Sequence, residues 1–341
     1  MRIGIAFDLK PKAALPAGAP DDLHEEFDNP ATIQSLAEAL RGLGHDVIEL
    51  GNGRSLIEKL LADPPDLVFN IAEGQGTSRN REARVPAVCE MLGVPCTGSD
   101  ALTLGIALDK DICRRMVEDA DVIVPLGILI TFPEPLYDGD FAEFPAMVQE
   151  SDLELPLIAK PVCEGSSKGI RSKCLIEKLE DVGPVVVSLW HDYKQGVLLE
   201  EFIAGEEVTV GVVGNDPPRI LGMMRVIPKQ ATEHFVYSLE VKRDWENQVR
   251  YETPPQLPHE TLLAIEAAAL QAYDILGCRD VTRIDFRVRD GVPYFLEANP
   301  LPGLNPETGD IVLMAKAMGM NHQQLIGIIV EAAVTRLGLK K

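Results

Sequence analysis

Two short segments near the C-terminus combine the side chains of a metal site. Residues 283–286 (Arg-Ile-Asp-Phe) and 294–300 (Tyr-Phe-Leu-Glu-Ala-Asn-Pro) both alternate apolar and polar residues, which predicts two strands. The Asp-Gly step between them predicts a hairpin turn. Such a hairpin would collect on one face Arg283, Asp285, Glu297 and Asn299. Two carboxylates and an amide oxygen suit Mg²⁺, although an ordinary solvated strand face could carry the same residues.

The charge of the chain excludes several classes of partner. Its 341 residues include 32 lysines and arginines against 53 aspartates and glutamates, which gives a net charge of −21. This charge repels phosphate backbones and anionic membranes, so we expect neither nucleic acid nor a membrane as a partner. A nucleotide still fits, provided that a local basic pocket and a metal hold it. The length predicts two or three domains, and a hydrophobic content of 46% is enough for their cores.

The N-terminus and the cysteines indicate a cytoplasmic protein. The first apolar segment, residues 3–7, is interrupted by Asp8 and lacks the long apolar core of a signal peptide. No segment holds the ~18 uninterrupted apolar residues of a membrane span. The six cysteines contain no Cys-x-x-Cys pair, which is typical of reduced core thiols in an enzyme of this size.

Strands and helices alternate over residues 1–98, which predicts an α/β class with a parallel sheet. A polar, acidic stretch at residues 10–29 follows the first strand. Because ligands bind beyond the carboxyl ends of such strands, this stretch is either a lid or a disordered surface loop. A helical run at 101–118 comes next, and the remainder mixes short strands with further helices in an α+β pattern.

A loop with phosphate-binding chemistry follows an apolar strand that ends in Lys160. Residues 164–169 read Glu-Gly-Ser-Ser-Lys-Gly and supply backbone N–H groups, hydroxyls and positive charge. The loop lacks the spacing of a Walker A motif, and a plain β-turn would explain the sequence as well.

A second candidate ligand segment is an apolar strand that ends in Glu200 and Glu201. Phe202 and Ile203 follow it, so carboxylate and backbone groups can bind the edge of an adenine while apolar side chains cover its face. Glu207, beyond the next turn, is placed to bind ribose hydroxyls. A sheet edge with solvated acids is the competing interpretation.

Together these segments resemble the ATP-grasp superfamily, and within it the D-alanine–D-alanine ligases. The resemblance covers roughly residues 66–340. Its motifs, in chain order, are Cys96-Thr97-Gly98-Ser99, Leu108-Asp109-Lys110, Ala159-Lys160-Pro161, the loop 164–169, Glu200-Glu201-Phe202-Ile203-Ala204-Gly205, Arg283-Ile284-Asp285 and residues 297–303.

The resemblance implies a three-part ATP-grasp fold. An N-terminal parallel α/β domain at residues 1–98 would precede a central lid domain at 99–199 and a C-terminal domain at 200–341 that carries the metal site. ATP would lie between the last two domains. The implied reaction joins a carboxylate to an amine through an acyl phosphate, and the family suggests a homodimer.

The resemblance also implies roles for individual residues. The ATP phosphates would be held by Lys110, Lys160, Lys242, Glu164, Ser166, Ser167 and Lys168. Adenosine would be bound by Glu200, Phe202, Ile203 and Glu207. Two Mg²⁺ ions, for which Mn²⁺ can substitute, would be held by Asp285, Glu297 and Asn299. The catalytic residues would be Arg283, Lys242 and Gly303, the last through its backbone N–H.

The amino-acid half of the site departs from the family. Glu73 stands where the ligases have a histidine, Arg243 replaces a tyrosine, and Thr308 replaces a serine. Glu26 or its neighbour Glu25 is the nearest counterpart of the glutamate that binds the first amine. The substrate residues are therefore expected to be Glu26, Glu73, Arg243, Arg283 and Thr308.

These departures leave three functions open. They predict a ligase with altered amino-acid or peptide substrates, and the added acids Glu73, Glu307 and Asp310 favour a substrate rich in amines. A true D-alanine–D-alanine ligase and a non-catalytic ATP-binding module are the alternatives.

Overall fold

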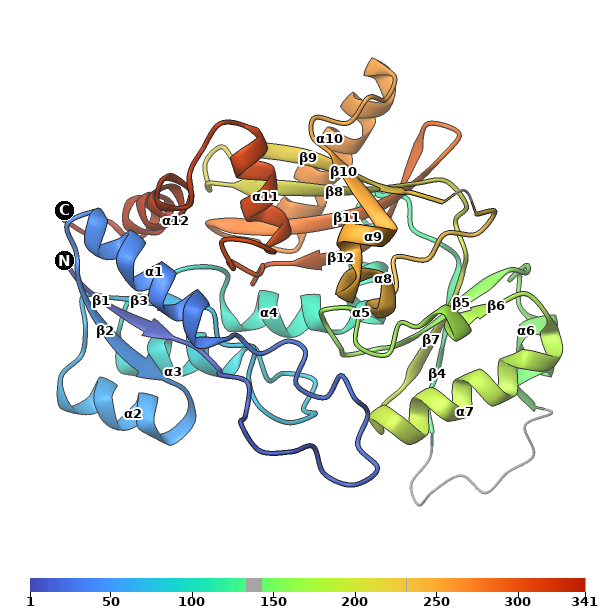
Figure 1. The fold of residues 1–341 in the computed structure, drawn as a ribbon, viewed down its shortest axis with the longest axis horizontal. Coiled ribbons are helices and arrows are strands. Elements are labelled where there is room, and N and C mark those ends of the chain that lie inside the picture. Colours follow the sequence, from blue (N-terminus) through green and yellow to red (C-terminus); the bar gives the residue numbers. More distant parts are fainter. Residues whose placement is uncertain (133–142, 231, 341) are drawn as a thin grey trace.

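The structure, a computed structural model, describes residues 1–132, 143–230 and 232–340. Three sheets organise this part of the chain, and helices cover them (Figure 1). One sheet is parallel and lies in the N-terminal region, and the other two are antiparallel. The predicted α/β class with an α+β remainder is confirmed.

The N-terminal sheet has the strand order β2-β1-β3. Its elements are β1 (Arg2–Ala6), α1 (Pro30–Gly42), β2 (Asp46–Gly51), α2 (Gly53–Ala62), β3 (Leu67–Asn70) and α3 (Arg84–Leu92). Helix α1 starts where the sequence signals it, because the Asn29 side chain accepts a hydrogen bond from the Thr32 N–H and proline occupies the first helical position. The stretch at residues 10–29 leaves the carboxyl end of β1 and runs toward the middle sheet (Figure 1).

The middle sheet has the order β4-β7-β5-β6. Its strands are β4 (Gly127–Ile130), β5 (Leu157–Pro161), β6 (Leu175–Ile176) and β7 (Val197–Glu201), and its helices are α6 (Glu143–Glu150) and α7 (Val182–Tyr193). Two 3₁₀ turns, Ser172–Cys174 and Leu179–Asp181, connect these elements. All five residues of β5 are buried, so Lys160 projects from a strand inside the protein.

The C-terminal sheet has the order β10-β9-β8-β11-β12. Its strands are β8 (Glu206–Val213), β9 (Arg219–Pro228), β10 (Val249–Glu252), β11 (Val281–Arg289) and β12 (Val292–Asn299). The associated helices are α4 (Ala101–Leu108), α5 (Lys110–Glu118), α8 (Leu239–Arg243), α9 (Trp245–Gln248), α10 (His259–Ile275), α11 (Asp310–Ala317) and α12 (His322–Leu337). The predicted helical run at 101–118 is thus two helices, because Asp109 ends α4 and caps α5.

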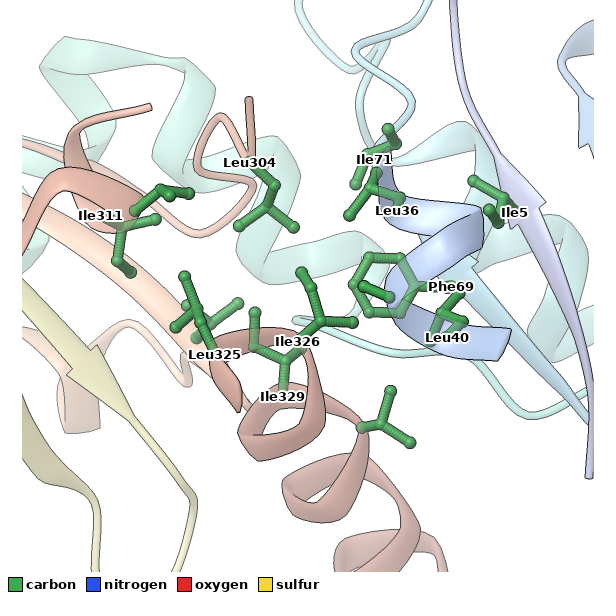
Figure 2. Close-up of a cluster of buried hydrophobic side chains, with 14 of the residues drawn as sticks. Ile5, Leu36, Leu40, Phe69, Ile71, Leu304, Ile311, Leu325, Ile326 and Ile329 are labelled. Atoms are coloured by element: carbon green, nitrogen blue, oxygen red, sulfur yellow. The ribbon is translucent and has the colours of Figure 1, made fainter. Parts of the chain in front are cut away.

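The hydrophobic cores show which parts of the chain pack together. Ile5 and Phe69 of the N-terminal sheet share one core with Ile326 and Ile329 of α12, as Figure 2 shows. Helix α5 packs in another core with β8, β11 and β12. The expected domain boundary at residues 199 and 200 falls inside β7, so the three-part division stays a prediction in its details.

Candidate active site

The predicted hairpin forms and gathers the metal-type residues. The register of β11 and β12 pairs Arg283 with Asn299 and Asp285 with Glu297. A one-residue shift of register between Asp285 and Phe286 brings Asp285 opposite Glu297, and the pairing continues beyond it to Arg289 and Val292. The positions of these four side chains are therefore fixed by two paired strands and not by a loop.

Buried ion pairs connect this face to the N-terminus of α5. Lys110 Nζ lies 2.8 Å from a Glu297 carboxylate oxygen, and Arg283 lies 2.9 Å from Asp285 and 3.6 Å from Glu297. Arg283 also pairs with Asp310 at 3.2 Å, and Thr209 Oγ1 donates to Asp285 at 2.8 Å. The cluster holds two cations and three carboxylates, so its own charges leave an excess of negative charge.

The two carboxylates of the hairpin have opposite pKa shifts. Burial raises the pKa of Asp285 to about 6, although the Arg283 guanidinium opposes this rise. Burial would also raise the pKa of Glu297, but the Lys110 ammonium and Arg283 outweigh it and hold that pKa well below its usual range. A divalent cation beside Asp285 would stabilise its charged form.

The donor set fits Mg²⁺ bound together with a phosphate ligand. Among residues 1–132, 143–230 and 232–340, no three His, Cys, Asp or Glu side chains gather into a metal cage. Two carboxylates with the Asn299 amide oxygen are the partial ligand set that Mg²⁺ uses when waters and phosphates complete its coordination.

A cavity with an empty volume of about 770 Å³ lies between the middle and C-terminal sheets. Its apolar wall includes Ile158, Ile170, Phe202, Ile203, Val236 and Leu296. Its polar lining includes Lys160, Ser167, Glu200, Glu207, Lys242, Asp285 and Glu297. The structure thus brings the residues expected to bind adenosine into one cavity with Asp285 and Glu297, two of the expected metal ligands. An apolar slot that ends in cations and carboxylates fits a nucleotide with its metal.

Two buried ion pairs order the adenosine end of this cavity. Lys160 Nζ donates to a Glu200 carboxylate oxygen at 2.6 Å. Arg287 pairs with Glu207 at 2.8 Å, donates to the Ile203 carbonyl oxygen and stacks over the Phe202 ring at 4.9 Å. These side chains of the cavity wall are therefore held by contacts within the protein itself.

The loop at residues 164–169 adopts a backbone that suits glycine- and serine-rich sequence. Ser166, Ser167 and Gly169 all have positive φ angles, of 49°, 59° and 74°. A Cβ on Gly169 would lie 2.4 Å from Pro161, so this position requires glycine. Lys110 Nζ donates to the Glu164 carbonyl oxygen at 2.7 Å, so the lysine that pairs with Glu297 also contacts this loop.

Acidic residues of the stretch at 10–29 hold this loop. Glu26 accepts from the Gly165 N–H at 2.7 Å and pairs with Arg81 at 2.7 Å and with Lys168 at 3.2 Å. Burial would raise the pKa of Glu26, but these two cations outweigh it and lower that pKa. Asp22, which is fully buried, accepts from the Gly169 N–H and from the Tyr193 hydroxyl. The stretch is an ordered part of the site rather than a disordered loop.

A second cavity, with an empty volume of about 1290 Å³, adjoins the first and shares Tyr237, Lys242 and Asp310 with it. Its lining contains all the predicted substrate residues, namely Glu26, Glu73, Arg243, Arg283 and Thr308. The catalytic candidate Gly303 and the metal candidate Asn299 line it as well. The exposed Thr308 and the backbone of Gly303 lie at its open side.

Arg243 is already paired within the protein. It contacts Asp21 at 2.5 Å and Glu25 at 2.8 Å, so it connects α8 to the acidic stretch. Asp310 is paired with Arg283, and Glu307 is exposed outside the cavity lining. Of the added acids that favoured an amine-rich substrate, Glu73 alone lines the cavity without an ion pair in the described part of the chain.

Sequence comparison gives the site a family. A family model for the C-terminal part of D-Ala–D-Ala ligases matches residues 130–331. A D-alanine–D-alanine ligase of Fervidobacterium nodosum is 32% identical over 314 residues, which cover 89% of this chain and 93% of that protein. The chain belongs to the D-alanine–D-alanine ligase family.

Other members of the D-alanine–D-alanine ligase family agree over the same length. The enzyme of Aquifex aeolicus is 31% identical over 88% of this chain and 93% of its own. A D-alanine–D-alanine ligase from Bacillus anthracis, solved in complex with ATP, superposes with a TM-score of 0.71 at 21% identity, over 98% of each chain. VanG D-Ala:D-Ser ligase from Enterococcus faecalis gives the same TM-score at 22% identity, over 98% of this chain and 99% of its own.

Family membership establishes the reaction class. As a D-alanine–D-alanine ligase relative, the chain is an ATP-dependent ligase that forms C–N bonds and uses a divalent metal. Within the described ranges, no helix has the length and apolar character needed to cross a membrane.

Sequence reasoning missed several residues of the site. Arg81 is almost completely buried and binds Glu26, Glu164 and the Cys163 carbonyl oxygen, while its neighbour Glu82 faces the interior as well. Arg287, which orders the nucleotide cavity, was also missed. The charged run before α3 resembled a solvated helix start, so no linear pattern distinguished Arg81 and Glu82. Arg287 could have been found, because its alternation continues that of Arg283 and Asp285.

Proposed function

We propose that this ligase joins two amino-acid or peptide substrates, at least one of which is not D-alanine. One substrate carboxylate attacks the γ-phosphate of ATP, ADP leaves, and an acyl phosphate forms. The amine of the second substrate then attacks the acyl carbon, and phosphate leaves as the amide forms. The observation that carries this proposal is the position of the ion-paired cluster at the junction of the two cavities, because Asp285 and Glu297 line the first cavity and Arg283 lines the second.

The residues of this chain have distinct tasks in that reaction. Lys110, Lys160, Lys242 and the loop at 164–169 neutralise the phosphates, and the apolar wall with Glu200 and Glu207 binds adenosine. Two Mg²⁺ ions at Asp285, Glu297 and Asn299 would supply charge for the transferring phosphoryl group. Arg283 and the Gly303 N–H face the second cavity and stabilise the negative oxygen that develops on the acyl carbon.

Exclusion of water follows from the contacts of the loop at 164–169. Glu26 and Asp22 hold this loop over the junction of the cavities, which protects an acyl phosphate from hydrolysis. Similarity to the D-alanine–D-alanine ligases also supports a three-part domain organisation and a cytoplasmic homodimer. Light scattering would test the dimer.

Phosphate release across a panel of amino acids and dipeptides, with product mass determined for every hit, tests the proposal. We expect D-alanine alone to be a poor substrate, because Glu73 stands in the substrate cavity without an internal partner. Vigorous D-alanyl-D-alanine formation with no better substrate would instead identify an ordinary D-alanine–D-alanine ligase. Tight ATP binding without turnover would indicate a non-catalytic module.

A further inference from the structure

Three carboxylates near the reacting centre have no ion-pair partner within the described part of the chain. They are Asp28, Glu73 and Glu82. Glu82 is only 6% exposed. A charged carboxylate that is buried without a counter-charge is strongly unfavourable. Folding alone does not favour such a group, which points to a bound ligand as its partner.

The neighbouring cations are already engaged. Arg81 and Lys168 are shared between Glu26 and Glu164, at distances from 2.5 to 3.3 Å. Lys110 pairs with Glu297 at 2.8 Å. These carboxylates therefore become charged only if a positive group enters with the ligand, and without it they take up protons.

Glu73 and Glu82 line a narrow third cavity with an empty volume of about 410 Å³. Lys110 and Glu164 line it too, and the charges of Arg81 and Lys110 only partly offset the effect of burial on the Glu82 carboxylate. The third cavity shares Glu73, Ser166 and Asn299 with the second cavity, which contains the expected substrate residues. A single ligand can therefore extend from one cavity into the other.

The pKa shifts agree with a missing counter-charge. Burial raises the pKa of Glu82 to about 8 and that of Asp28 to about 7. Burial and the charges of Glu82 and Glu26 raise the pKa of Glu73 well above its ordinary value. A bound ammonium group would restore the charged form of each carboxylate.

We propose that the substrate whose carboxylate is activated is a diamino acid, with its second amine held between Glu73 and Glu82. This inference rests on the proposed function and names the substrate class. The third cavity borders Lys110, Ser166, Glu297 and Asn299, which is the phosphoryl-transfer end of the site. A ligand that reaches into it therefore presents its carboxylate beside the transferred phosphate.

The experiment compares matched pairs of carboxyl donors with one acceptor amino acid. The pairs are 2,4-diaminobutyrate with 2-aminobutyrate, ornithine with norvaline, and lysine with norleucine, each as both enantiomers. Phosphate release gives kcat/KM, and product mass shows which carboxylate reacted. We expect one diamino acid to exceed its neutral partner by at least ~30-fold, the scale of one buried charge pair.

Variants then locate the preference. Glu73→Gln and Glu82→Gln should each reduce that ratio by roughly 10-fold or more, while KM for ATP stays unchanged. Glu90→Gln, on the exposed side of α3, is the matched control and should keep the ratio. Thermal unfolding with and without ATP checks that each variant folds, and Glu82→Asp replaces Glu82→Gln if the latter does not.

The outcomes separate this inference from the proposed function. Ligase activity with neutral amino acids but no preference for any diamino acid overturns the inference and leaves the proposed function intact. A preference that survives both glutamine substitutions also overturns it. Failure to form an amide from any donor overturns both.

Discussion

The pair formed by Lys160 and Glu200 gives the sharpest test of the nucleotide cavity. Both side chains are buried, with Glu200 only 2% exposed, and the two charges lie 2.6 Å apart. At an effective dielectric constant of ~20 they attract by roughly 6 kcal/mol before the unfavourable effect of burial is subtracted. Replacing Lys160 by methionine keeps the length of the side chain but leaves Glu200 buried without a partner.

We expect Lys160→Met to lower the free energy of unfolding by about 3–5 kcal/mol, the usual effect of breaking a buried pair. The double variant Lys160→Met/Glu200→Gln should recover most of this loss, because it removes both charges. A saturating ATP analogue, at ~100 times its Kd, should stabilise the unchanged protein by ~2.7 kcal/mol. Both variants should lose most of that stabilisation, because Lys160 no longer binds phosphate.

Urea unfolding followed by Trp190 fluorescence measures these effects. Trp190 lies in α7, which packs against the middle sheet, and Trp245→Phe removes the second of the two tryptophans. Lys178→Met, which removes an exposed lysine of the same part of the chain, is the matched control. A loss below ~1 kcal/mol in Lys160→Met, or full retention of the ATP effect, would refute the reasoning.

Three further predictions follow from the same geometry. Glu297→Gln should reduce turnover by at least ~100-fold, because it removes a negative charge from the expected metal site. Asp290→Asn, in the exposed hairpin turn, is the control and should leave turnover unchanged. Unchanged turnover in Glu297→Gln would falsify the metal assignment. Since the pKa of Glu82 is raised from 4.5 to about 8, the folded chain retains a proton that the unfolded chain releases, and stability should fall as pH rises from about 5 to above 8. Glu82→Gln should remove this fall, by no more than ~5 kcal/mol, and parallel pH profiles of urea unfolding for both proteins would contradict the shift. Arg243→Ala should raise KM for the amino-acid substrates by roughly 5-fold and leave KM for ATP unchanged, because it removes the ion pairs that connect α8 to Asp21 and Glu25. Steady-state kinetics with each substrate varied measures both constants. A raised KM for ATP with unchanged KM for the amino acids would contradict the prediction.

Local sequence determined the parts of the site that depend on neighbouring residues. Alternation at period two and the Asp-Gly turn predicted the hairpin, and the structure contains it. The β-bulge between Asp285 and Phe286 was not predicted, although it is what places Asp285 opposite Glu297. The glycines and serines of the loop at 164–169 matched a backbone with positive φ angles. Periodicity was less reliable within the run at 101–118, because it does not show that Asp109 caps a new helix and places Lys110 at its first turn.

Tertiary structure decided which charges meet. The sequence does not show that Arg243 pairs with Asp21, because the two residues lie 222 positions apart in the chain. Glu26 is held by Arg81 and Lys168, whereas Glu82, next to Arg81 in the chain, is left facing a cavity. Backbone conformation and the alternation within one strand follow from short-range sterics and periodicity, so the local sequence indicates them. The pairing of a buried charge depends on which distant elements are packed together, and only the folded chain decides that.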